Sequence, residues 1–108
     1  MQSPEIFFGF DIRTGTIIHA EIFPEAHKPA YKLTIDFGEA GIKKSSAQIT
    51  EKYSPDTLIG KQIVAVINLP RKQIGKFISE CLVLGVYTNN GVVLLAPDQN
   101  TENGSKVG

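Results

Sequence analysis

Basic side chains are concentrated on a predicted loop between two apolar stretches of the chain. Arg71, Lys72 and Lys76 follow the apolar segment 63–69, and the next apolar segment begins at Cys81. A loop between two core strands can present such groups to a partner. No nearby residues pair a nucleophile with a base or form a set of metal ligands. The segment therefore predicts binding of a ligand, not catalysis.

Groups that could act as nucleophiles or metal ligands are few. His19 and His27 lack the i, i+4 spacing of a helical metal pair, and the chain has one cysteine, whereas a zinc site needs three or four ligands. Cys81 stands in an apolar segment, which predicts a buried thiol. No serine lies in a Gly-x-Ser-x-Gly motif, and the phosphate-loop and dinucleotide-binding glycine motifs are absent. We therefore expect no enzyme activity, no metal and no cofactor.

Length and charge narrow the class of protein. The 108 residues predict one domain spanning 1–108, and no apolar run approaches the roughly 20 residues of a membrane span. The N-terminus has no signal-peptide pattern and a single cysteine fits a reducing compartment, so we expect a cytoplasmic protein without membrane insertion. Net charge is zero, yet residues 28–76 carry nine Lys and Arg against four Asp and Glu. This basic middle can present a positive face, although zero overall charge disfavours tight nonspecific nucleic-acid binding.

The elements that position these groups are predicted to be mainly strands. Residues 31–37 alternate apolar and polar side chains, and Asn89-Asn90-Gly91 is a strong hairpin-turn signal. The segment 11–23 reads as a long strand bent near Gly15. Ser54 before Pro55 indicates the start of a short helix within 50–60. The remaining predicted strands cover residues 42–49, 62–69, 77–87 and 92–96.

This order of elements predicts an all-β fold. The best match is a five-stranded Greek-key barrel of the oligonucleotide/oligosaccharide-binding (OB) type, and another small all-β barrel is the alternative. A short N-terminal helix is expected near residues 4–8, and a C-terminal hairpin extends the barrel. The polar, glycine-rich tail from Pro97 is expected to be loosely held.

The predicted ligand surface follows from this barrel. In an OB fold the ligand lies across strands 2 and 3 and beneath loops at one end, so cations from two distant segments could converge there. Phe77 could serve either as a core residue or as a stacking surface. The predicted ligand-contacting residues are Lys32, Lys43, Lys44, Ser46, Gln48, Asn68, Arg71, Lys72, Lys76, Phe77, Ser79 and Glu80.

Four segments together resemble the CsaA group of the tRNA-binding-domain family, over about residues 5–93. They are residues 11–17 (Asp-Ile-Arg-Thr-Gly-Thr-Ile), 43–50 (Lys-Lys-Ser-Ser-Ala-Gln-Ile-Thr), 68–75 (Asn-Leu-Pro-Arg-Lys-Gln-Ile-Gly) and 79–85 (Ser-Glu-Cys-Leu-Val-Leu-Gly). The resemblance implies an OB fold with terminal extensions and a homodimer. One branch of the family binds the outer corner of tRNA, and the CsaA branch is described as a chaperone for unfolded preproteins in export.

Two departures favour the CsaA branch over the tRNA-binding branch. Residues 43–50 lack the Arg and Gly of the tRNA-binding tracts, and Cys81-Leu82 replaces the Gly-Met that often follows Ser-Glu there. The leading hypothesis is a non-catalytic chaperone that binds unfolded polypeptides for export, possible partners being preproteins and export machinery. The alternative is a tRNA-binding protein using the same basic groove. Extensions 1–10 and 88–108 would form the dimer, with predicted contacts at Ile6, Phe7, Phe8, Val92, Val93 and Leu94.

Overall fold

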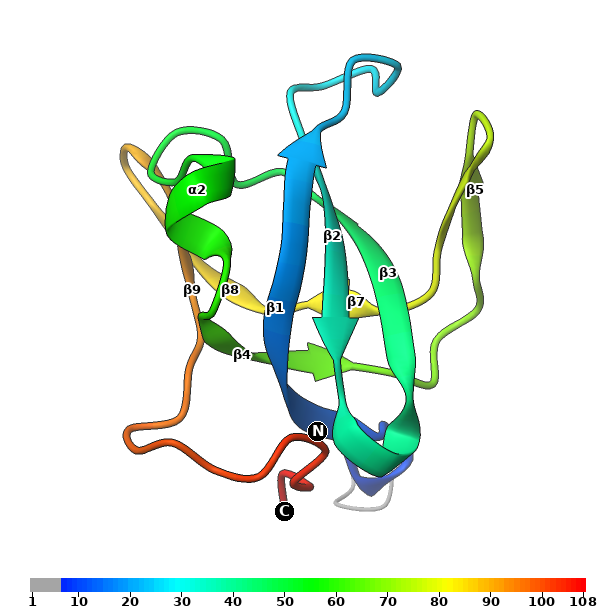
Figure 1. Ribbon diagram of the computed structural model, residues 1–108, viewed down its shortest axis with the longest axis vertical. Coiled ribbons are helices and arrows are strands. Elements are labelled where there is room, and N and C mark those ends of the chain that lie inside the picture. Colours follow the sequence, from blue (N-terminus) through cyan, green and yellow to red (C-terminus); the bar gives the residue numbers. More distant parts are fainter. Residues whose placement is uncertain (1–6) are drawn as a thin grey trace.

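A computed structural model describes residues 7–108 and shows an all-β fold built around an antiparallel sheet (Figure 1). Five strands form this sheet in the order β3-β2-β1-β4-β7. The elements are β1 (Ile12–Ile22), β2 (Tyr31–Asp36), the 3-10 helix η1 (Gly38–Ala40), β3 (Ile42–Ala47), α2 (Pro55–Leu58), β4 (Gln62–Val66), β5 (Lys72–Ile74), β6 (Phe77–Ser79), β7 (Leu82–Val83), β8 (Gly85–Thr88) and β9 (Gly91–Leu94).

The sheet curls until its two outer strands nearly meet, which confirms the predicted OB barrel. The Glu80 N–H donates to the Lys44 carbonyl at 2.7 Å, and the Ser45 hydroxyl donates to the Cys81 carbonyl at 3.1 Å. These bonds join β3 to the chain just before β7. This near-closure covers part of the outer edges of β3 and β7 and leaves the rest of the β3 edge unpaired.

The core is filled by alternate residues of β2 and the residues they face. Leu33, Ile35 and Phe37 are fully buried, as the period-2 pattern predicts. Gly15 allows Phe37 to pack against β1, because a Cβ at this position would lie 2.7 Å from the Phe37 ring. The irregularity in β1 lies slightly beyond the predicted bend, between Ile17 and His19.

Two short-range predictions are confirmed. Helix α2 begins after Ser54 with Pro55 in its first turn, and it buries Leu58 in the core. Strands β8 and β9 form a hairpin closed by Asn89 and Asn90, with Thr88 paired to Gly91. Sequence-local turn and capping signals therefore specify these elements correctly.

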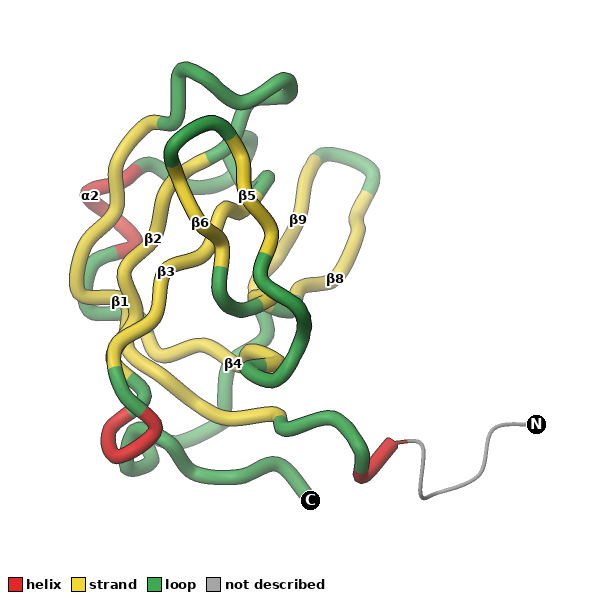
Figure 2. The backbone as a smooth tube through the Cα atoms, turned by 90° about the vertical axis from the view of Figure 1, so that its right-hand side faces the viewer, coloured by secondary structure: helices red, strands yellow, loops and turns green. Residues whose placement is uncertain are grey.

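The single strand predicted over residues 77–87 is wrong, because the structure divides this segment into β6, β7 and β8. Strands β5 and β6 form a separate two-stranded hairpin, residues 71–80, which we call the arm. The chain leaves the arm at Glu80, whose backbone bonds to Lys44 and interrupts the strand. The arm and the β8–β9 hairpin both point away from the C-terminus and the start of β1 (Figures 1 and 2).

The expectation of a loose C-terminal tail is also wrong. The Thr14 N–H donates to the Ser105 carbonyl, the Gly104 N–H to the Thr14 carbonyl, and the Val107 N–H to the Ile12 carbonyl, at 3.0, 2.7 and 2.8 Å. The pairing of β1 with β2 begins only at Thr16, so this part of β1 has a free edge. The tail pairs with that edge and satisfies its backbone groups.

The predicted N-terminal helix lies mostly outside the described residues. Phe7 and Phe8 have helical conformation, and the Phe10 N–H donates to the Phe7 carbonyl at 3.0 Å. No helix within residues 7–108 is long and apolar enough to cross a membrane.

Candidate ligand-binding groove

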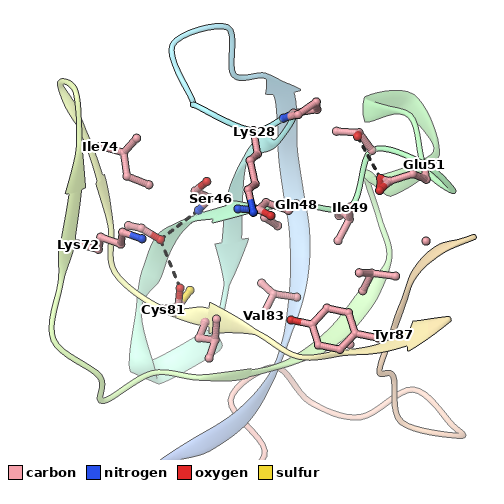
Figure 3. Close-up of a pocket in the computed structure, with 18 of the residues that line it drawn as sticks. Lys28, Ser46, Gln48, Ile49, Glu51, Lys72, Ile74, Cys81, Val83 and Tyr87 are labelled. Atoms are coloured by element: carbon pink, nitrogen blue, oxygen red, sulfur yellow. Dashed lines mark hydrogen bonds between the residues drawn. The ribbon is translucent and has the colours of Figure 1, made fainter. Parts of the chain in front are cut away.

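A groove with a volume of about 1010 Å³ lies between the barrel, the arm and the β8–β9 hairpin (Figure 3). The arm contributes Lys72 and Ile74, and β3 with the residues after it contributes Ser46, Gln48 and Ile49. The opposite wall is formed by β7 and β8. Its side chains include Leu82, Val83 and Tyr87. The walls thus combine apolar side chains with polar and charged ones, as ligand sites commonly do.

The arm is attached to β3 through side chains as well as backbone. The Ser79 hydroxyl accepts the Ser46 N–H at 3.0 Å, and the Glu80 carboxylate accepts the Lys44 N–H at 3.0 Å. The side chains of Ser79 and Glu80 therefore accept the β3 backbone N–H groups that the carbonyls of a neighbouring strand would otherwise accept. Ser79 and Glu80, both predicted to contact a ligand, thus fix the arm to β3, and Ser79 also lines the groove.

Strand alternation in the arm separates the predicted cations. Lys72 pairs with Ser79, and both line the groove. Arg71, Lys76 and Lys44 instead line a second cleft of about 310 Å³, together with Phe77, Ile78 and Glu80. Arg71 lies 3.6 Å from the Glu80 carboxylate across this cleft. We call this surface the outer cleft. The cations of the two segments are thus divided between two surfaces.

Lys32 and Phe77 form an anchor between the arm and the barrel. The Phe77 ring packs edge-on against Phe23 with centroids 5.3 Å apart, and the Lys32 ammonium lies 5.1 and 5.9 Å from the Phe23 and Phe77 centroids. Such cation–π contacts hold a charge over aromatic rings. Lys32 also lies 3.4 Å from Glu21, and hydrogen bonds from His19 and Lys32 lower the pKa of that carboxyl. Phe77 therefore fastens the arm and is half-buried.

Two other predicted site residues lie away from the groove lining. Lys43 is half-buried and lines neither the groove nor the outer cleft. Asn68 holds the N-terminal segment: its amide donates to the Gly9 carbonyl and its oxygen accepts the Asp11 N–H, both at 2.8 Å. Of the neutral residues predicted to contact a ligand, Ser46 and Gln48 lie along the groove.

Cys81 forms part of the groove wall and is only 7% exposed, which confirms the predicted burial. Burial raises the pKa of this thiol to about 11. A protonated thiol is a poor nucleophile, so the groove gains no reactive group from Cys81. His19 and His27 are exposed, and among residues 7–108 no three His, Cys, Asp or Glu side chains gather as a metal site.

Several groove residues were not anticipated from the sequence. Tyr87 is 91% exposed at the rim, Lys28 reaches over the groove, and Glu51 lies at the other end from Lys72. The signal for Tyr87 was its place just before the hairpin turn, where an aromatic side chain has little of its own chain to pack against. Lys28 and Glu51 lie in predicted loops and had no distinguishing signal.

The predicted dimer contacts divide into exposed and internal residues. Phe7 and Phe8 are 44% and 62% exposed, and Val93 is 39% exposed. Val92 and Leu94 pack partly against the chain's own core. Ile6 lies outside the described residues.

Comparison with known proteins places this chain in a family. Residues 12–106 match the model of the putative tRNA binding domain. Methionine–tRNA ligase of Methanococcoides burtonii is 35% identical over 100 residues, covering 92% of this chain but 14% of the ligase. The chain thus spans about one-seventh of the length of this relative. The similarity concerns one domain of a much larger enzyme.

Solved structures extend the similarity over the whole chain. The chaperone CsaA of Bacillus anthracis is 53% identical with a TM-score of 0.94, covering 100% of this chain and 99% of that one. The CsaA chaperone protein of Picrophilus torridus is also 53% identical, with a TM-score of 0.95 and full coverage of both chains. A MetRS-related protein of Pyrococcus horikoshii matches at 25% identity and a TM-score of 0.87, over 99% and 97% of the two chains. This chain belongs to the tRNA-binding domain family, as a CsaA-type member.

Proposed function

We propose that this protein is a non-catalytic chaperone that holds extended, unfolded polypeptide in the groove. The observation that carries the proposal is the size and chemistry of that groove: about 1010 Å³, with Ile74, Leu82, Val83 and Tyr87 along its walls. Such walls can cover apolar side chains that an unfolded chain exposes. The similarity to two CsaA proteins, which are chaperones, supports this function.

The proposal includes a homodimer that works in the cytoplasm on preproteins destined for export. Phe7 and Phe8, in the N-terminal segment, and Val93, on β9, present exposed apolar surface. A second copy would cover this surface and duplicate the groove, so one client could engage both grooves with higher avidity. Light scattering should report a dimer for the wild type and a monomer for Phe8→Asp combined with Val93→Asp.

The groove is tested by a matched pair of substitutions and a fluorescein-labelled peptide of alternating apolar and polar residues. Leu82→Asp places a charge in the groove, and Ile78→Asp places one in the outer cleft. Both residues are exposed at nearly the same level, 48% and 43%, so both variants should fold. We expect Leu82→Asp to weaken peptide binding by about tenfold or more, because a bound peptide would cover the new carboxylate and remove its solvation. Ile78→Asp should leave peptide affinity unchanged. Equal affinities would contradict the proposal.

RNA binding is a second candidate function, and the outer cleft is the observation that favours it. Lys44, Arg71 and Lys76 gather there beside Phe77, as phosphate contacts and an aromatic ring do in many RNA sites. The family model is named for tRNA binding. Lys44→Ala with Lys76→Ala should then reduce affinity for tRNA and spare affinity for the peptide. Loss of peptide binding in this double variant would show that the two surfaces are not separate.

A further inference from the structure

The outer edge of β3 is only partly paired. Ile35–Lys43, Leu33–Ser45 and Tyr31–Ala47 are register pairs with β2, and the Phe37 N–H bond to the Gly41 carbonyl fixes which of them exchange hydrogen bonds. The backbone groups of Lys44, Ser46 and Gln48 therefore point to the opposite edge. The hydrogen bonds from Lys44 and Ser46 to Glu80 and Ser79 confirm this direction.

This edge is unpaired where it enters the groove. The Gln48 N–H and carbonyl, which follow Ser46 along this edge, have no hydrogen-bond partner within residues 7–108. Beyond Ser46 the arm no longer supplies partners. All six residues from 46 to 51 line the groove. Because neighbouring strand residues point to opposite faces, lining by consecutive residues means that the groove runs along the backbone edge.

We propose that the bound polypeptide adds as a β-strand to this edge, pairing with the backbone that begins at the free N–H and carbonyl of Gln48. The inference rests on the proposed function and specifies how the same groove holds its ligand. A free strand edge offers an N–H and a carbonyl at every second residue, and an extended polypeptide supplies the matching carbonyl and N–H. Backbone hydrogen bonds do not depend on the identity of the ligand's side chains, so this mode of binding suits a protein that accepts many different unfolded chains.

The walls beside the edge fit the side chains of an added strand. Half-buried Val83 and the largely buried Ile49 and Cys81 form the apolar part of the lining. Lys72 carries charge on the side of the arm, and Lys28 carries charge above the groove (Figure 3). Alternate side chains of the added strand would meet the apolar surface, and those between them would face solvent. The occupant is therefore an extended segment with apolar residues at every second position.

Methylated peptides provide the test, since N-methylation removes a backbone donor and leaves the side chains in place. The probe is a fluorescein-labelled peptide of about eight residues that alternates valine and threonine. One derivative carries N-methyl groups on its valines and another on its threonines. Only one set of N–H groups can face the protein in a strand pair, so one derivative should lose about tenfold or more in affinity and the other should bind like the parent.

Equal behaviour of the two derivatives, whether both bind or both fail, would overturn strand addition. Failure of the unmethylated peptide to bind would instead refute the proposed function, and strand addition with it. The protein side is tested by Gln48→Pro, which deletes the N–H that faces the groove, against Gln48→Ala, which deletes only the side chain. Proline is tolerated on a strand edge where the N–H has no partner.

We expect Gln48→Ala to keep the affinity of the wild type and Gln48→Pro to weaken peptide binding by about tenfold. Thermal unfolding of both variants verifies that they fold. Unchanged binding by folded Gln48→Pro would contradict the pairing. If Gln48→Pro does not fold, the comparison of the two methylated peptides still decides the matter.

Discussion

The hydroxyl of Ser79 accepts the backbone N–H of Ser46 at 3.0 Å, so one side chain of the arm completes the edge of β3 where a neighbouring strand is absent. The arm forms its own two-stranded sheet and meets the barrel through this bond, the Glu80 contacts and the Phe77 anchor. The position of one groove wall therefore depends on a few side chains.

Ser79→Ala should lower the free energy of unfolding by about 1–2 kcal/mol, because the half-buried Ser46 N–H loses its acceptor. Urea denaturation measures this loss. Ser46→Ala is the matched control: it retains the backbone N–H, and its own hydroxyl makes no hydrogen bond within residues 7–108. Equal stability of the two variants would show that the bond does not hold the arm.

Phe77→Ala should loosen the arm by removing the aromatic pair with Phe23 and one ring beneath Lys32. Aromatic pairs and cation–π contacts contribute about 0.5–1.5 and 0.5–1 kcal/mol beyond burial. Amide hydrogen exchange of residues 72–79 should therefore become faster, and exchange in β1 and β2 should not. Ile78→Ala, on the other face of the arm, should leave exchange in the arm unchanged. Equal exchange rates in the two variants would contradict the anchor.

Thr14→Val tests the pinned C-terminal tail. The buried Thr14 hydroxyl lies 3.0 Å from the Thr101 hydroxyl and donates to the Glu102 carbonyl at 3.1 Å. The isosteric change should cost about 1–2 kcal/mol of unfolding free energy and increase proteolysis beyond residue 100. Thr34→Val is the control, since the Thr34 side chain makes no hydrogen bond within the described chain. A tail that stays protected in Thr14→Val would disprove this role.

Cys81 predicts a pH dependence of stability. The folded thiol keeps its proton up to about pH 11, whereas the unfolded thiol loses it near its ordinary pKa of 9.0. The folded state thus binds more protons in this window, so the free energy of unfolding should fall as pH rises from about 9 to 11. The difference between wild type and Cys81→Ala, measured by urea denaturation, isolates this effect from other titrating groups. A constant difference across that range would contradict the buried, protonated thiol.

The barrel was predictable because its strands carry local signals. The alternation of residues 31–37 and the turn at Asn89-Asn90-Gly91 each specify an element without reference to the rest of the chain. The cap at Ser54 likewise marks helix α2. The OB topology gives the order of the strands in the sheet. Contacts between residues that lie far apart in the sequence can then be inferred from that order.

What could not be predicted depends on tertiary pairing. Residues 77–87 look like one apolar strand, but the bond from Glu80 to Lys44 divides them. The tail is polar and glycine-rich, yet the free edge of β1 orders it. The cations were expected on one surface. Side chains of the arm alternate between its two faces, and the register of β5 with β6 places Lys72 in the groove and Arg71 and Lys76 in the outer cleft.

The salt dependence of binding tests the central claim most directly. The affinity of the alternating apolar–polar peptide for the wild-type protein is compared with that of tRNA at about 50 and 200 mM salt. Three phosphate contacts in the outer cleft would reduce tRNA affinity by roughly 20- to 40-fold over this range. Apolar groove contacts and backbone pairing should change peptide affinity by about twofold or less. Peptide binding that falls as steeply as tRNA binding, or tight tRNA binding with no peptide binding, would contradict a polypeptide-holding groove.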